Sequence, residues 1–320
     1  MLKDVLAKVG KKSGTIISEK TTAGILAGAT IAHDCTGALS KIVKRRVHKK
    51  IFTSCWHVDN PKYFRISQIS GMCQRQAVFF KLLGNVPVEI QQEIEFDAES
   101  RMSLGTSFHD YIQTTVLGPM GVLKGNWLCK ECFVVHKDCF YPSKCSGCGH
   151  SSFQYEEYTL YNDEMLVCGH IDGILSKKRL AQLSMAKVIV VPVEFDRIEN
   201  DELAVLEIKS TSSFGYQKIL SSLEPPEYYK VQALFYQKAL GLTETVFFYY
   251  DRDSGGVVSF SYKFEQELYD FYFGKMKYVL KCIEEKRLPE DKVCLTMKDG
   301  KKCNCPFVEM CFRKVGEELV

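Results

Sequence analysis

The chain has 320 residues, of which 46% are hydrophobic and 12% aromatic, and its formal net charge is +3. This composition supplies a substantial core and excludes a fibrous or intrinsically disordered protein. No run of 18 apolar residues and no secretory leader occurs, so we expect a soluble, intracellular (cytoplasmic) protein with no membrane partner. The 14 cysteines are then expected to bind metals as reduced thiols rather than to form disulfides.

The N-terminal part carries most of the positive charge. Residues 1–50 contain 11 Lys and Arg against 3 Asp and Glu, and the rest of the chain contains 31 against 36. The run KIVKRRVHKK at 41–50 fits phosphate binding and a solvated helix face about equally well. No helical or strand period persists here, so we predict a basic N-terminal extension over 1–60 and a folded domain over 61–320.

From Phe64 onward the hydrophobic pattern predicts helices and strands. Apolar residues at near-helical spacing run from there to Gly84, and a second helix is expected over 101–116. A cysteine-rich insert at 127–150 precedes four β-favouring stretches, with a hairpin-like excursion between about 176 and 202. The four stretches are 153–161, 165–175, 187–195 and 203–209.

The C-terminal third continues this pattern. Pro225 and Pro226 open a helix that runs to about Leu240, and TETVFFYYD and VVSFSYKF resemble a strand pair. A long helix is expected over 264–286. Strands framed by helices predict an α/β fold.

The insert WLCKECFVVHKDCFYPSKCSGCGH has the spacing C-x2-C-x12-C-x2-C. Each C-x2-C unit can wrap two thiolates around one ion, so this pattern predicts a closed, structural, tetrahedral zinc site of the zinc-ribbon type. Cys139, His136 and His150 remain possible substitutes. The predicted ligands are Cys129, Cys132, Cys145 and Cys148.

The segment AVLEIKS places Glu207 and Lys209 two positions apart on a predicted strand. Side chains alternate along a strand, so these two share one side while Leu206 and Ile208 enter the core. A carboxylate that holds a divalent cation, beside an amine that orients water or stabilises charge, suits phosphodiester hydrolysis.

Two further segments complete a set around this strand. Upstream, CGHIDGIL supplies Asp172, and downstream follows the helix YYKVQALFYQKALG. An Asp-bearing strand, an E-x-K strand and a helix in this order resemble the PD-(D/E)XK nucleases, specifically their RecB-like branch. In that branch the helix carries a Gln and a Tyr four residues apart, matched by Gln232 and Tyr236 on one helix face. The resemblance covers about residues 64–312 and implies a restriction-endonuclease-like core, a central mixed sheet flanked by helices.

The resemblance also implies the site. The branch carries Gly-x-x-x-His on an upstream helix, matched by Gly105 and His109 in LGTSFHDY. Lys209 is then expected to assist the attacking water, and Gln232 and Tyr236 to act beside the active site or the bound strand. The implied ligands of one or two Mg²⁺ or Mn²⁺ ions are His109, Asp172, Glu207 and the Ile208 carbonyl.

Some ligand assignments stay open. His170 lies two residues before Asp172 and is an alternative to His109. About 35 positions separate Asp172 from Glu207, which leaves Asp196 and Glu194 as alternatives to Asp172.

One early and three late cysteines resemble the iron-sulfur subgroup of this branch, including its CRISPR-adaptation exonucleases. The subgroup implies a [4Fe–4S] cluster that closes the nuclease domain like a clasp. The family spacing is C-x2-C-x5-C, whereas GKKCNCPFVEMCF has C-x1-C-x5-C, so Cys294 is an alternative to Cys303. The implied ligands are Cys73, Cys303, Cys305 and Cys311.

Together these features predict a Mg²⁺- or Mn²⁺-dependent DNA nuclease, an exonuclease in particular, of replication, recombination, repair or defence. Its expected substrate is single-stranded DNA or DNA with free ends, and a helicase or recombination partner or a homo-oligomer is compatible with it. The sequence has no G-x-x-x-x-G-K-[ST] motif and hence no helicase motor of its own. The alternatives are a non-catalytic nucleic-acid-binding or assembly protein with the same fold, and a zinc-ribbon scaffold.

Overall fold

The computed structural model describes residues 62–71, 73–83, 96–185, 203–290, 307 and 311. The basic run at 41–50, the expected strand 187–195 and Asp196 lie outside this set, as does Glu194. Three of the cysteines considered as cluster ligands, Cys294, Cys303 and Cys305, also lie outside it.

The main sheet is mixed and seven-stranded, with the order β10-β9-β8-β7-β2-β3 and with β4 paired to β2. β8 and β9 run parallel, and the other neighbouring pairs are antiparallel. The strands are β2 (Leu123–Cys129), β3 (Val135–Phe140), β4 (Phe153–Glu156), β7 (Gly173–Ser176), β8 (Leu203–Thr211), β9 (Glu244–Asp251) and β10 (Val257–Lys263).

A second sheet has three strands in the order β1-β6-β5. They are β1 (Phe64–Arg65), β5 (Tyr158–Asn162) and β6 (Val167–Ile171). β5 and β6 are antiparallel, and their register pairs Tyr158 with Ile171. One residue separates β4 from β5 and one separates β6 from β7, so the chain passes between the two sheets twice, at Glu157 and at Asp172.

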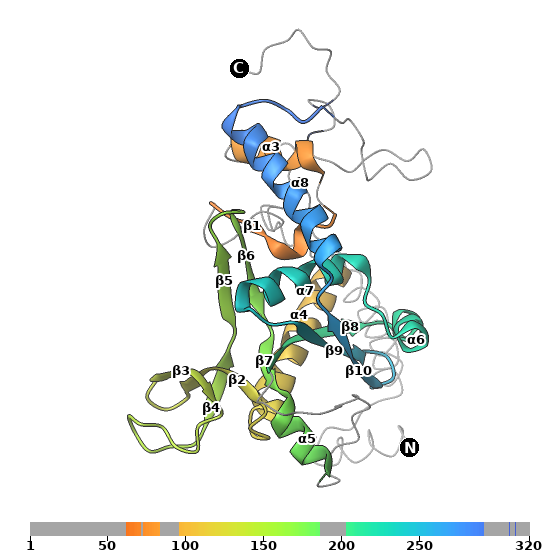
Figure 1. The fold of residues 1–320 in the computed structure, drawn as a ribbon. Helices are drawn as coiled ribbons and strands as arrows, with labels where there is room; N and C mark the ends of the chain where they lie inside the picture. The colour runs from red at the N-terminus through yellow and green to blue at the C-terminus, as the bar shows by residue number, and fades with distance from the viewer. Residues whose placement is uncertain are drawn as a thin grey trace, which may run out of the picture. The chain divides into compact units, whose positions relative to one another are not determined.

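Within residues 50–92 and 101–320, helices pack around these sheets (Figure 1). Prolines and a glycine set the limits of α7: Pro226 is its N-cap, and Gly241 ends it in the left-handed region, at φ +66°. α3 packs against α8, and α7 packs against β8, α8 and the short 3-10 helix η1 (Ile66–Gln68). The helices are α3 (Gln74–Leu83), α4 (Phe96–Asp110), the π-helix η3 (Tyr111–Leu117), α5 (Lys177–Met185), α6 (Ser213–Ser222), α7 (Glu227–Leu240) and α8 (Gln266–Glu284).

The central strand β8 is buried on both faces. Val205 packs into one hydrophobic cluster with side chains of α7 and α8, whereas Leu206 and Ile208 pack into a second cluster with side chains of η3 and of the cysteine-rich insert. Leu206 and Ile208 therefore enter the core, as the alternation predicted. The mixed α/β fold, a central sheet flanked by helices, is confirmed.

Two predictions about local structure were wrong. The excursion after residue 176 begins as the helix α5 rather than as a hairpin, because LAQLSM has good helix formers and the chain leaves the sheet at once. The segment after Phe64 is not one helix: β1 and η1 come first, and α3 begins only at Gln74. Pairing of β1 with β6 overrides the local helical pattern there.

None of the described helices has the length and apolar character to cross a lipid bilayer.

A partly buried ion pair joins α5 to β9, where the Lys177 ammonium donates a hydrogen bond to the Glu244 carboxylate. Burial opposes ionisation of Glu244, but Lys177 outweighs it and lowers the pKa of Glu244 below 4.5. A lowered carboxyl pKa contributes stability above the unfolded pKa, and that contribution is lost as pH falls through the folded pKa.

We therefore predict that Glu244→Gln lowers the free energy of unfolding by about 2 kcal/mol near neutral pH, because a charged hydrogen bond is lost. The difference from the wild type should shrink as pH falls below 4.5. Urea unfolding near neutral pH and at a pH below 4.5 measures the two free-energy differences. Glu285→Gln is the control, because Glu285 forms its ion pair with Arg287 at the exposed surface. A difference independent of pH would contradict the prediction.

Candidate active site and cysteine centre

The E-x-K strand buries its carboxylate completely. Glu207 is 0% exposed on β8, and its Oε1 accepts a hydrogen bond from the Lys209 Nζ. The Glu207 Oε2 is buried and has no hydrogen-bond donor among the described residues. The Lys209 Nζ also lies 4.8 Å from the centre of the Tyr229 ring on α7. A buried carboxylate oxygen without a donor is unstable unless a cation or water reaches it, so this atom marks the site.

Asp172 connects β8 to α4. It lies at the crossing between β6 and β7, and its Oδ2 accepts a hydrogen bond of 2.5 Å from the Ile208 N–H. Its Oδ1 lies 3.2 Å from the Nδ1 of His109, in the last turn of α4. The structure thus brings together three segments that are far apart in sequence: those of His109, Asp172 and Glu207.

The charges of this group depend on one another. Burial raises the pKa of Glu207 to about 7. Burial also opposes the ionised form of Asp172, but the charge of Lys209 and the hydrogen bonds from His109 and the Ile208 N–H outweigh it and lower the Asp172 pKa. Burial opposes the protonated form of Lys209 as well, but the charges of Glu207 and Asp172 outweigh it and raise the Lys209 pKa. Lys209 is therefore a cation at neutral pH.

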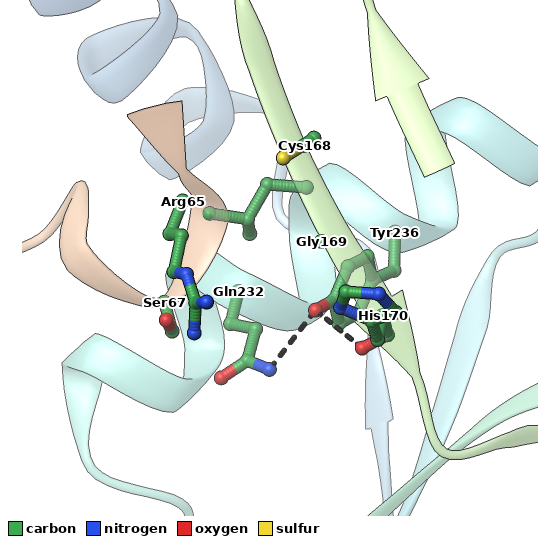
Figure 2. Close-up of a pocket in the computed structure, with 8 residues that line it drawn as sticks. Arg65, Ser67, Cys168, Gly169, His170, Gln232 and Tyr236 are labelled. Carbon is green, nitrogen blue, oxygen red and sulfur yellow. Dashed lines mark hydrogen bonds between the residues drawn. The ribbon is translucent and has the colours of Figure 1, made fainter. Parts of the chain in front are cut away.

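Gln232 and Tyr236, the two residues predicted on one face of α7, line a small pocket. The Tyr236 hydroxyl donates a hydrogen bond of 2.7 Å to the His170 carbonyl, and the Gln232 Nε2 donates one of 3.2 Å to the Tyr236 hydroxyl. Figure 2 shows both residues at a pocket of about 140 Å³ that Arg65 and Ser67 also line. The His170 side chain is exposed and lines this pocket, whereas His109 is the imidazole beside Asp172.

Sequence motifs missed four residues of this region. Glu157 lies with His109 and Asp172, and one possible ligand atom from each of the three is within 4.8 Å of the other two. Gln113, buried on η3, donates to Glu157 and to the Asp172 carbonyl. Tyr229 and Arg65 also escaped notice. No motif assigns a role to these residues, and the β5–β6 register that places Glu157 beside Asp172 is known only from the structure.

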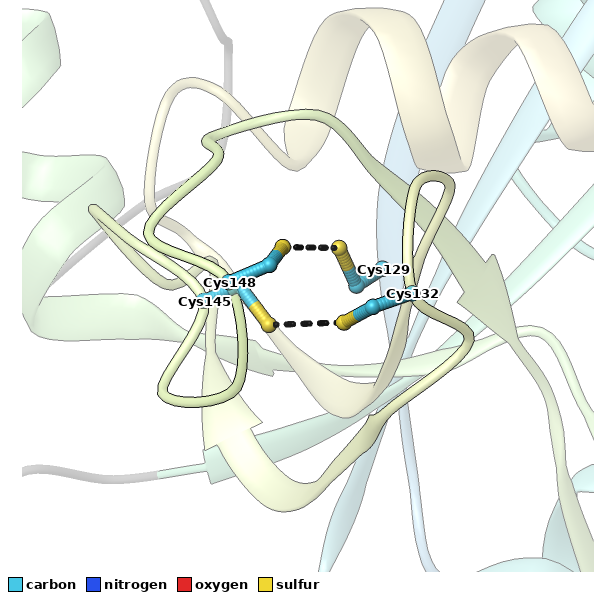
Figure 3. A group of neighbouring side chains, drawn as sticks. All are labelled: Cys129, Cys132, Cys145 and Cys148. Atoms are coloured by element: carbon cyan, nitrogen blue, oxygen red, sulfur yellow. Dashed lines mark hydrogen bonds between the residues drawn. The ribbon is translucent and has the colours of Figure 1, made fainter.

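The four predicted cysteines of the insert converge (Figure 3). The Sγ atoms of Cys129 and Cys148 are 3.5 Å apart, as are those of Cys132 and Cys145, and all four lie within 4.8 Å of one another. All four are thiols. A tetrahedron of thiolates with metal–sulfur bonds of about 2.3 Å has S–S edges of about 3.8 Å, so these thiols fit one metal ion. N–H groups of Cys132 and Glu131 lower the pKa of Cys129 to about 6, which favours its thiolate.

The proposed substitutes are less well placed. Among the described residues, the four-cysteine group includes neither Cys139 nor a histidine. The Cys139 Sγ lies 3.6 Å from the His136 carbonyl. The His136 Nε2 is 3.4 Å from the Cys145 Sγ, as a neighbour of the group.

Phe307, one of two described residues in the C-terminal part of the chain, packs on the helix that follows Cys73. Phe307 is 1% exposed, and its ring centre lies 5.3 Å from that of Phe79 and 4.7 Å from that of Phe80, both on α3. Cys311 follows one turn later, its N–H donating to the Phe307 carbonyl. Phe307, four residues before Cys311, therefore packs on the helix that begins directly after Cys73.

Comparisons with known proteins give the following likenesses. No family model and no curated protein matches the chain. An alkaline exonuclease from Laribacter hongkongensis, LHK-Exo, is 13% identical with a TM-score of 0.41, over 72% of this chain and 92% of that one. The same enzyme in complex with dAMP is 12% identical with a TM-score of 0.40, over 70% and 89%. The protein SSO0001 is 12% identical with a TM-score of 0.38, over 85% and 96%. Scores below 0.5 carry no functional inference, so the function must be argued from this chain's own residues.

Gly169 allows Tyr236 to reach the His170 carbonyl, because a Cβ at this glycine would lie 2.6 Å from the Tyr236 hydroxyl oxygen. We predict that Gly169→Ala lowers the free energy of unfolding by about 1–3 kcal/mol, since the buried tyrosine must shift. Gly274→Ala is the control, because nothing lies within 4 Å of its new Cβ. The control should be neutral or slightly stabilising in a helix. Equal urea midpoints for the two variants would refute the role of Gly169.

Proposed function

We propose that the protein is a Mg²⁺- or Mn²⁺-dependent DNA nuclease with the site of the RecB-like PD-(D/E)XK enzymes. The observation that carries this proposal is the buried Glu207 Oε2, which has no donor among the described residues and belongs to the same charged group as Asp172 and His109. A protein that used these residues only for packing would leave no buried carboxylate oxygen unsatisfied. Exonuclease action on DNA with free ends is the form that the family resemblance implies.

The proposed ligands have the donor types that suit a divalent cation. Glu207 and Asp172 would supply carboxylate oxygens, His109 would supply an imidazole nitrogen, and the Ile208 carbonyl is the fourth ligand implied by the resemblance. When bound, such a cation withdraws charge from the scissile phosphate and lowers the pKa of a bound water.

The remaining groups have separate roles. Lys209, a cation with its ammonium next to Glu207, orients the attacking water and stabilises negative charge as the phosphodiester bond breaks. Tyr236 and Gln232 form the wall of the polar pocket beside the site. Arg65 and Ser67 give this pocket a guanidinium and a hydroxyl, which are common donors to DNA phosphates. In this proposal the pocket positions the DNA strand at His170, two residues before Asp172.

We propose two cysteine-held metal centres in addition. Zinc is the ion that suits the four cysteines of the insert, and a [4Fe–4S] cluster held by Cys73, Cys303, Cys305 and Cys311 is consistent with the packing of Phe307 on α3. Thiolate centres persist in the reducing cytoplasm, where DNA and a helicase or recombination partner are available. The proposed organisation is a basic extension over 1–60 and a nuclease domain over 61–320, with the zinc-ribbon insert at 127–150.

The nuclease assignment predicts metal-dependent cleavage that requires Lys209. End-labelled linear single- and double-stranded DNA should be degraded with Mn²⁺ or Mg²⁺, and Lys209→Ala should reduce the rate at least about 100-fold. The matched control is Lys263→Ala, an exposed lysine at the end of β10, which should retain full activity.

A closed circular single strand of the same sequence tests the mode of cleavage. An exonuclease leaves the circle intact, whereas an endonuclease cuts it. DNA that is bound tightly but remains uncut with either metal would replace the proposal with a non-catalytic DNA-binding protein.

The two cysteine centres predict independent metal losses. Anaerobically purified protein should be brown and contain about four iron atoms and one zinc ion per chain. Cys73→Ser should lose the iron and its visible absorbance but keep zinc, and Cys148→Ser should lose zinc but keep iron. Cys282→Ser, a buried cysteine of α8 outside both centres, should keep both. Iron that survives Cys73→Ser would contradict the cluster assignment.

A further inference from the structure

Glu157 and Asp172 occupy matching positions in the fold. Each is the single residue between a strand of the three-stranded sheet and a strand of the seven-stranded sheet. The β5–β6 register pairs Tyr158 with Ile171 and Thr159 with His170. Extending it by one step places Glu157 opposite Asp172, and residues directly opposite on antiparallel strands have Cβ atoms about 5 Å apart.

One buried amide fixes this arrangement. The Gln113 Nε2 donates a hydrogen bond of 2.9 Å to the Glu157 Oε1 and one of 2.8 Å to the Asp172 carbonyl oxygen. Gln113 is 4% exposed, so its amide is held in place by the protein interior. Glu157 is thereby directed toward the site, whereas its neighbour Glu156 is exposed.

Two carboxylates this close repel each other when both are ionised. The Lys209 ammonium contacts Glu207, on the β8 side of Asp172, and His109 contacts the Asp172 Oδ1. A divalent cation between Glu157, Asp172 and His109 would remove this repulsion.

We propose that Glu157 is a direct ligand of a divalent cation that it holds together with His109 and Asp172. Possible ligand atoms of the three lie within 4.8 Å of one another. Two carboxylate oxygens and one imidazole nitrogen form a donor set that Mn²⁺ accepts readily. The inference deepens the proposed nuclease function by adding a ligand that no sequence motif of the site contains.

The test is Mn²⁺ binding to the full-length, zinc-loaded protein in the absence of DNA, measured by calorimetry. Glu157→Gln should weaken Mn²⁺ binding at least about 10-fold. Glu156→Gln removes the same charge one residue away, where the side chain is exposed, and should change the affinity less than about 2-fold.

Thermal unfolding without Mn²⁺ separates a ligand from a structural residue. A glutamine can still accept the Gln113 hydrogen bond and removes the repulsion with Asp172, so the metal-free Glu157→Gln variant should melt no lower than the wild type. Unchanged Mn²⁺ affinity, or a clearly lower melting temperature of the metal-free variant, would overturn the proposal. Neither readout involves cleavage, so a protein that fails to cut DNA but loses Mn²⁺ affinity in Glu157→Gln would refute the nuclease function alone.

Discussion

The hydrogen bond from the Ile208 N–H to the Asp172 carboxylate is the interaction on which the geometry of the site depends. It ties the point where the chain crosses from one sheet to the other to the central strand of the larger sheet. With Oδ2 occupied in this way, Asp172 presents Oδ1 to His109 and so fixes the last turn of α4 relative to β8. A side chain held by a backbone donor has little freedom, which is what a metal ligand or a catalytic group requires.

The charge balance of the site follows from this constraint. One ammonium, Lys209, faces two buried carboxylates, Glu207 and Asp172, and Glu157 adds a third acidic group at the other crossing between the sheets. Buried negative charge without a matching cation destabilises the fold, and here it is concentrated in a few ångströms. Most of the core is apolar and well packed around β8, so the fold tolerates this local penalty. Strain of this kind is expected where a protein is organised for binding rather than for stability.

Much of the fold could be predicted from sequence, but not the relations between distant segments. Apolar alternation identified β8 and its two faces, and Pro226 and Gly241 mark α7 because proline and glycine act locally. The segment after Phe64 was misread because pairing with β6, about 100 residues away, decides its conformation. α5 was missed because the stretch before β8 was read by its β-favouring part, residues 187–195.

In the candidate site, too, local patterns could be predicted from the sequence, whereas relations between distant segments could not. Spacing alone predicted the four cysteines, because each C-x2-C unit is a local turn and the structure brings the two units together. Family resemblance, rather than any physical rule, joined His109, Asp172 and Glu207 into one set. Glu157 belongs to no motif, and its place opposite Asp172 follows only from strand register, which a single sequence does not reveal.

The four cysteines of the insert are connected to the candidate site through strands β2 and β4. Cys129 ends β2, and the β2–β4 register pairs it with Phe153, the first residue of β4. β4 then leads after four residues to Glu157. An ion that holds the turns around Cys129 and Cys145 would therefore also hold the start of β4 against the end of β2. The reason is that its ligands lie at the two ends of the segment that connects these strands. In this way an ion bound in the insert would stabilise the strand that delivers Glu157 to Asp172.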